Sequence, residues 1–216
     1  MLLLFDIDGT LVDTGGAGLT SLQETAVEVF GDPGPPLDLA GSTDGGILRG
    51  LFEHFGQEYD ASVEEKFYQA YLPRLDTALN DESFGGRLLD GVTELLTQVQ
   101  EAGHTLGLLT GNIEQGAIAK VSHYGIADFF HFGAYGDDHW DRDKLGPIAL
   151  ERAREFSGES FSLKETLVIG DTLKDVRCAH ALGSECLAVA TGKFTVEELG
   201  DCGADRVVAD LVGLTL

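Results

Sequence analysis

The chain has 216 residues, and its hydrophobic content of 43% is enough for one large domain or for a core with a small insert. It carries 37 acidic and 14 basic side chains, a formal net charge of −23, which argues against nucleic acids and anionic membrane surfaces as partners. No apolar run approaches the ~20 residues that a membrane span requires.

The first predicted element is a buried strand over residues 2–7, which are apolar apart from Asp6. An unpaired buried carboxylate is costly, so we expect Asp6 where the strand ends and a cavity begins. The strand repeat places Asp8 on the same side as Asp6. Two carboxylates at the end of a first strand indicate a ligand site in an open α/β sheet. Solvated aspartates in a strand-end turn are the simpler alternative.

The next segment predicts helices only. Apolar spacing favours helices over residues 19–30, 43–55 and 63–79, and glycine-rich breaks at 15–18 and 84–86 suit hinges. We therefore expect a small helical domain over residues 15–86, inserted into a core made of residues 1–14 and 87–216.

From residue 87 onward, helix and strand patterns alternate. Such alternation predicts an α/β fold with a doubly wound parallel sheet. The predicted helices are 90–101, 113–124, 148–156 and 172–182, and the predicted strands are 105–109, 129–134, 166–169, 185–190 and 206–209.

Carboxylates are expected to converge at one edge of this sheet. Asp171 follows the strand 166–169, and Asp175 lies one turn further on in the next helix, so both can face the crevice beside Asp6 and Asp8. Converging aspartates repel one another unless a cation is bound. A small set of oxygen ligands favours Mg²⁺.

A phosphate site is expected beside these carboxylates. The strand 105–109 delivers Thr110, Gly111 and Asn112 to the start of a helix. A hydroxyl together with the free amides of a helix start suits an anion such as phosphate. The segment 141–144 (DRDK) offers a basic side chain to complete the neutralisation.

These residues carry a family resemblance. The segments FDIDGTLVDT (5–14), LLTGN (108–112) and VIGDTLKD (168–175), with a basic residue before a helix between the last two, are similar to the four motifs of the haloacid dehalogenase superfamily. The chain looks most like the branch that contains phosphoglycolate phosphatases and β-phosphoglucomutases. The helical insert resembles the small cap domain of that branch.

The resemblance implies a Mg²⁺-dependent phosphatase that hydrolyses a small phosphomonoester, phosphoglycolate-like or a sugar phosphate. Asp6 would be the nucleophile that forms an aspartyl-phosphate, and Asp8 would act as acid and then as base. Mg²⁺ would be held by the Asp6 side chain, the Asp8 backbone carbonyl and Asp171. Asp175 would bind it through water or orient its neighbours, and Thr110 with the loop amides of Gly111 and Asn112 would hold the phosphoryl group.

The third motif departs from the family pattern. Relatives usually have Lys-Pro-x-Pro-x-Pro, whereas this chain has RDKLGP over residues 142–147. If Pro147 matches the last proline, Arg142 takes the place of the motif lysine, and Lys144 lies two residues later. The register favours Arg142, which binds phosphate as a planar fork rather than as a point charge. Lys144 remains the second candidate.

Other functions stay open. A phosphomutase would use the same aspartyl-phosphate but pass the phosphoryl group to a sugar hydroxyl, and it would need a bisphosphate activator. A non-catalytic binding module on the same fold has no need for the intact aspartates. A dehalogenase needs neither an acid at Asp8 nor a metal.

The cellular location, the partners and the oligomeric state can also be predicted. Three cysteines without metal-ligand spacing are typical of reduced thiols, so we expect a cytoplasmic protein. Its partner would be a small phosphate ester, with no nucleic acid and no membrane, and the chain would be a monomer or a homodimer. The acidity suits a high-salt cytoplasm, where salt screens the self-repulsion.

Overall fold

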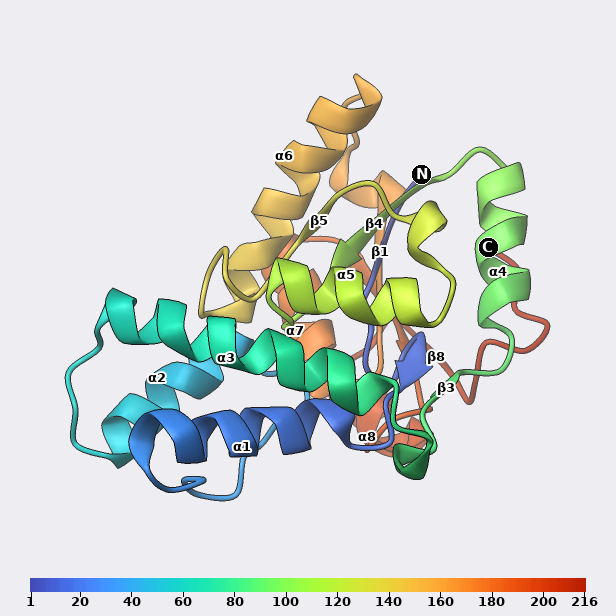
Figure 1. The fold of residues 1–216 in the computed structure, drawn as a ribbon. Coiled ribbons are helices and arrows are strands. Elements are labelled where there is room, and N and C mark those ends of the chain that lie inside the picture. Colours follow the sequence, from blue (N-terminus) through green and yellow to red (C-terminus); the bar gives the residue numbers. More distant parts are fainter.

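A six-stranded parallel sheet forms the centre of the computed structural model, which describes all of residues 1–216. The strand order is β5-β4-β1-β6-β7-β8, and every neighbouring pair is parallel (Figure 1). The strands are β1 (Leu2–Phe5), β4 (Thr105–Leu109), β5 (Gly133–Ala134), β6 (Thr166–Gly170), β7 (Glu185–Val189) and β8 (Arg206–Val208).

Helices cover both faces of this sheet. On one face α4 (Val92–Glu101) and α5 (Glu114–His123) share a core with Leu3 and Phe5 of β1. On the other face α6 (Leu145–Ser157) and α7 (Leu173–Leu182) share a core with Leu2 and Leu4. Successive strand side chains point to opposite faces, so the apolar run of β1 supplies both cores. The predicted doubly wound α/β fold is confirmed.

Three further helices form a separate group. They are α1 (Ala17–Phe30), α2 (Asp44–His54) and α3 (Ala61–Leu79), and Figure 1 shows them beside α5, away from the sheet. Their apolar faces build a core of their own, which Ile113 joins from the start of α5; its largest members include Leu22, Leu48, Leu51, Phe52, Phe67, Tyr71 and Leu75.

A short antiparallel ribbon joins the helical group to the rest of the chain. It consists of β2 (Val12–Asp13) and β3 (Arg87–Leu88), with Val12 opposite Leu88. We propose that residues 15–86 form a cap domain on a core of residues 1–14 and 87–216, with this ribbon as the junction.

The structure differs from the sequence predictions in four places. The ribbon was not predicted, because two-residue strands have no measurable periodicity. Residues Ala127–Phe129 form a 3₁₀ turn instead of the start of a strand, so β5 is short. Helix α6 begins three residues earlier than expected, since Pro147 is tolerated in a first turn. The last difference is α8 (Val196–Asp201), whose start has a capping box of Thr195 and Glu198.

None of the helices combines the length and the apolar character that a bilayer crossing requires.

Candidate active site

A cavity of about 420 Å³ lies where the carboxyl ends of β1, β4 and β6 meet the helical group. Strand β1 lies between the other two, so the loops that follow these three strands are neighbours. Asp6 and Asp8 follow β1, Thr110 to Asn112 follow β4, and Asp171 follows β6; all of them line the cavity. The convergence that the sequence predicts is therefore present.

Gly9 allows the chain to turn beside these carboxylates. Its φ of 81° is in the left-handed region, and a Cβ there would lie 2.4 Å from Oδ2 of Asp171. Only glycine permits both the backbone conformation and the close approach.

Three buried carboxylates form the innermost part of the site. Oxygens of Asp6, Asp171 and Asp175 lie within 4.8 Å of one another, and each side chain is almost inaccessible to solvent. Burial, together with the charge of Asp175, raises the pKa of Asp6 to about 6 and the pKa of Asp171 well above its usual value. One guanidinium lies among these three carboxylates, so it cannot neutralise all of their charge. The remaining carboxylate oxygens form a donor set that fits a hard divalent cation such as Mg²⁺.

That guanidinium belongs to Arg142, which lies in the 3₁₀ turn η3 (Arg142–Lys144). Its Nη2 is 3.1 Å from Oδ1 of Asp6 and also pairs with Asp175. Burial alone would lower the pKa of Arg142, but the charges of Asp175 and Asp6 raise it, so the side chain stays cationic. Lys144 is exposed and does not line the cavity. The structure brings Arg142 to the site and leaves Lys144 outside it.

The helix after β6 fixes the third carboxylate. Oδ2 of Asp175 accepts hydrogen bonds from the backbone N–H of Thr172 at 3.0 Å and from its hydroxyl at 2.6 Å, and Oδ1 faces Arg142. Asp171 accepts only one side-chain hydrogen bond, from Thr10 at 3.3 Å. Asp171 is therefore the freer ligand, whereas Asp175 is placed to orient its neighbours.

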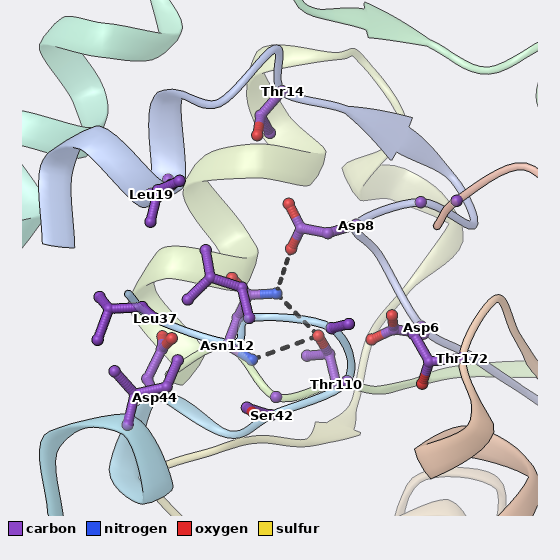
Figure 2. A pocket seen from close by; sticks show the side chains of 18 of the residues that line it. Asp6, Asp8, Thr14, Leu19, Leu37, Ser42, Asp44, Thr110, Asn112 and Thr172 are labelled. Atoms are coloured by element: carbon purple, nitrogen blue, oxygen red, sulfur yellow. Dashed lines mark hydrogen bonds between the residues drawn. The ribbon is translucent and has the colours of Figure 1, made fainter. Parts of the chain in front are cut away.

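A second network connects Asp8 to the loop after β4. The amide nitrogen of Asn112 donates to Oδ2 of Asp8 and to Oγ1 of Thr110, both at 2.8 Å, and Figure 2 shows Asn112 between these two side chains. Lys120 of α5 completes the network, with its Nζ 2.7 and 2.8 Å from the two oxygens of Asp8 and 2.6 Å from Oδ1 of Asn112. The carboxylate of Asp8 is thus directed away from the other three aspartates.

The helical group closes the cavity through Asp44, the first residue of α2. Its backbone N–H donates to the carbonyl of Gly111 at 2.7 Å, and its carboxylate accepts from the N–H of Ile113 at 2.9 Å. Burial raises the pKa of this carboxylate to about 6, although the charge of Lys120 opposes the rise. The loop that holds Gly111 is therefore bound directly by the helical group.

Sequence reasoning missed both Lys120 and Asp44. A signal for Lys120 exists, because it lies on the buried face of α5 between Ala117 and Val121, where the helical repeat calls for an apolar residue. A charged side chain in such a position needs partners, and Asn112 lies eight residues earlier, just before the helix begins. Asp44 resembles an ordinary helix-start residue, so only the three-dimensional contact distinguishes it.

Comparison with known proteins identifies the family. A model of the haloacid dehalogenase-like hydrolases matches residues 3–189. The chain belongs to this family, as its four motifs indicate, and it is an enzyme.

Two relatives of known name indicate the class of enzyme within this family. The chain is 27% identical to a phosphoglycolate phosphatase of Nitrosococcus oceani, over 98% of this chain and 93% of that protein. It is also 27% identical to a phosphoglycolate phosphatase of Thiobacillus denitrificans, over 99% of this chain and 93% of the relative. These relatives place the chain among the phosphoric monoester hydrolases.

A solved structure shows the same fold. The crystal structure of a hydrolase from Pseudomonas syringae aligns with a TM-score of 0.73 at 20% identity, covering 97% of this chain and 94% of the other. The likeness extends over the helical group as well as the sheet.

Proposed function

We propose that this protein is a Mg²⁺-dependent phosphatase that hydrolyses a small phosphomonoester through an aspartyl-phosphate on Asp6. The observation that carries the proposal is the setting of Asp6. Its carboxylate lies at the base of the cavity, paired with the buried Arg142, beside two further carboxylates and next to Thr110. A nucleophile, a cation for the phosphoryl oxygens and a metal-type donor set therefore meet in one place.

The metal site would be formed by Asp6 and Asp171, with the backbone carbonyl of Asp8 as a further ligand. Asp175 would orient this set, since both of its oxygens already have partners in Thr172 and Arg142. When bound, Mg²⁺ would supply charge neutralisation for the carboxylates and for the phosphoryl oxygens.

The reaction then follows from the chain's own groups. A carboxylate oxygen of Asp6 attacks phosphorus, the bond from phosphorus to the alcohol oxygen breaks, and protonated Asp8 gives its proton to the leaving alkoxide. In the second step Asp8, now a carboxylate, takes a proton from water as the water oxygen attacks phosphorus. The bond from phosphorus to Asp6 breaks, which releases inorganic phosphate and restores the Asp6 carboxylate.

The loop after β4 would hold the transferred group. Thr110, Gly111 and Asn112 line the cavity that Asp6 also lines, with the amide nitrogen of Asn112 bonded to the hydroxyl of Thr110, and Arg142 lines the same cavity in contact with Asp6. Most of the acceleration would come from this positioning and from charge neutralisation, because phosphoryl transfer needs little covalent chemistry from the protein.

The cavity favours a small substrate. Its volume of about 420 Å³ is at the lower end for ligand sites, and apolar side chains of the helical group line its outer part, among them Leu19, Leu22, Leu37 and Ile47. The names of the curated relatives make phosphoglycolate the first compound to test, and sugar phosphates the second. We place the enzyme in the cytoplasm, acting on a free metabolite.

The test is the release of inorganic phosphate from a panel of small phosphomonoesters, with Mg²⁺ and with a chelator. The proposal predicts release that requires Mg²⁺ and that Asp6→Asn abolishes while its thermal unfolding stays cooperative. Release that persists in Asp6→Asn would rule out the nucleophile. If no substrate releases phosphate, but a sugar phosphate isomerises in the presence of a bisphosphate, the protein is a mutase instead.

A further inference from the structure

Lys120 is a buried cation that none of the family motifs contains. Its side chain is 4% exposed, on a face of α5 otherwise occupied by apolar residues. A buried ammonium is stable only with close partners, and Lys120 has two, the carboxylate of Asp8 and the amide oxygen of Asn112. Both partners line the cavity of the proposed active site, and Lys120 itself lines it as well.

The first consequence concerns the orientation of Asn112. Because Lys120 can only donate hydrogen bonds, the group that faces it at 2.6 Å is the amide oxygen. The amide nitrogen is therefore turned toward Thr110 and Asp8. Without the ammonium, a flipped amide would present its oxygen to Asp8 and to the phosphoryl site, where it would repel negative charge.

The second consequence concerns the position of Asp8. The side chain of Asp8 is 41% exposed, so its own packing does not fix it. The ammonium lies 2.7 and 2.8 Å from its two oxygens and holds the carboxylate on the side of the cavity where the β4 loop ends. Gly18 of α1 faces the ammonium from the helical group, where a Cβ would lie 3.5 Å from Nζ. The ammonium of Lys120 thus lies between Gly18 of α1 and its two partners, Asp8 and Asn112.

We propose that Lys120 is a positioning residue, which places the carboxyl group of Asp8 and the amide of Asn112 for the reaction. The proposal rests on the function proposed above. In this proposal a residue of α5, outside the family motifs, aligns the carboxyl group of Asp8 that transfers the proton.

The test compares two substrates that differ in their need for a proton. A simple alkyl phosphate leaves as a basic alkoxide and needs proton transfer, whereas p-nitrophenyl phosphate leaves as a stabilised anion and does not. Lys120→Met keeps an unbranched side chain that is one atom shorter, and removes the charge and the donors. We expect it to lower the ratio of kcat/KM for the alkyl phosphate to kcat/KM for p-nitrophenyl phosphate by at least about tenfold, which is part of the roughly 10²–10⁴-fold that a positioned proton donor supplies.

This ratio separates positioning from folding. The concentration of active enzyme cancels in it, so a partly unfolded variant still gives the correct value. Lys120→Gln, which is uncharged but retains an amide donor, provides a second variant with the same expected direction. Lys164→Met removes an exposed lysine as the matched control and should leave the ratio unchanged.

An unchanged ratio in both Lys120 variants would overturn the proposal, because a structural role lowers the two values of kcat/KM together. Failure of the underlying function is a different result, since the wild-type enzyme would then release phosphate from neither substrate.

Discussion

At the scale of single residues, the structure separates two basic side chains, of which the sequence register favours Arg142. Arg142 and Lys144 are two residues apart in one short turn, yet Arg142 is buried between Asp6 and Asp175 whereas Lys144 is exposed. The planar guanidinium suits this position, because it reaches two carboxylates and also donates to the carbonyls of Gly41 and Leu109.

The two residues should therefore respond differently to truncation. Arg142→Ala leaves Asp6 and Asp175 buried without their cation, so we expect a loss of about 3–5 kcal/mol in the free energy of unfolding. We also expect kcat/KM to fall at least about a hundredfold, as when a charge-stabilising donor is removed. Lys144→Ala should change the unfolding free energy by no more than about 0.5 kcal/mol and leave kcat/KM unaffected. Denaturant unfolding measures the change in the free energy of unfolding, and phosphate release measures the change in kcat/KM. If Lys144→Ala has the larger effects instead, Lys144 is the basic residue of the third motif.

Asp44 gives a prediction about pH. Burial raises the pKa of its carboxyl group from 3.8 to about 6. A raised acid pKa stabilises the fold fully below the unfolded value, and this stabilisation is lost as the pH rises through the folded value. At about pH 7 the ionised carboxylate therefore costs about 3 kcal/mol relative to its protonated form.

Asp44→Asn keeps an oxygen for the N–H of Ile113 but cannot ionise. Relative to wild type, its free energy of unfolding should improve by about 2.4 kcal/mol between about pH 4 and about pH 7. Urea unfolding across this range measures the difference, with the exposed Asp201→Asn as the control for loss of one charge. A constant difference between Asp44→Asn and wild type would show that the carboxylate is not desolvated.

At the scale of elements, the contact between the helical group and the loop after β4 determines the shape of the site. Gly111 lies directly under residues 42–44, where a Cβ would lie 2.0 Å from the carbonyl oxygen of Ser42. Backbone atoms on both sides leave little room for adjustment, so any side chain at this position must push the helical group away.

Gly111→Ala should therefore open the cavity. We expect kcat/KM to fall at least about tenfold, because small displacements of reacting groups are costly. Amide hydrogen exchange at Asp44 should become faster, since its N–H donates to Gly111. Gly50→Ala in α2 is the matched control, because nothing lies within 4 Å of its Cβ, and it should stabilise the fold by about 0.4–1 kcal/mol. Normal activity in Gly111→Ala would contradict the closed arrangement.

Elements with a clear hydrophobic period could be predicted from the sequence. The parallel strands and the helices α1 to α5 and α7 lie within a few residues of the predicted ranges. The convergence of Asp6, Thr110 and Asp171 followed from strand ends alone. Lys120 and Asp44 could not be placed in the same way, because their partners lie 112 and 69 residues away in the sequence, at Asp8 and Ile113. The strand order, which makes β1 a neighbour of both β4 and β6, also needed the structure.

At the scale of the whole molecule, the main feature is the large excess of acidic over basic side chains. With 14 basic against 37 acidic side chains, most carboxylates have no cation to pair with, and the folded chain must hold this charge at close range. Salt should therefore stabilise the protein, because the screening length falls from about 10 Å at 0.1 M to about 3 Å at 1 M.

We expect the melting temperature at about pH 7 to rise steadily with potassium chloride over that range. The rise should be smaller near pH 4, where many carboxylates are protonated. Differential scanning calorimetry measures both series. A melting temperature that is independent of salt would contradict adaptation to a high-salt cytoplasm.

The measurement that tests the central claim most directly is detection of the phosphoryl group on Asp6. Enzyme turning over its best phosphomonoester with Mg²⁺ is quenched in acid, digested and examined by mass spectrometry. We predict one added phosphoryl group on the peptide that contains Asp6, removable by hydroxylamine as an acyl phosphate should be, and absent from Asp6→Asn. Steady turnover with no phosphoryl group on that peptide, or with the group on another residue, would contradict the account.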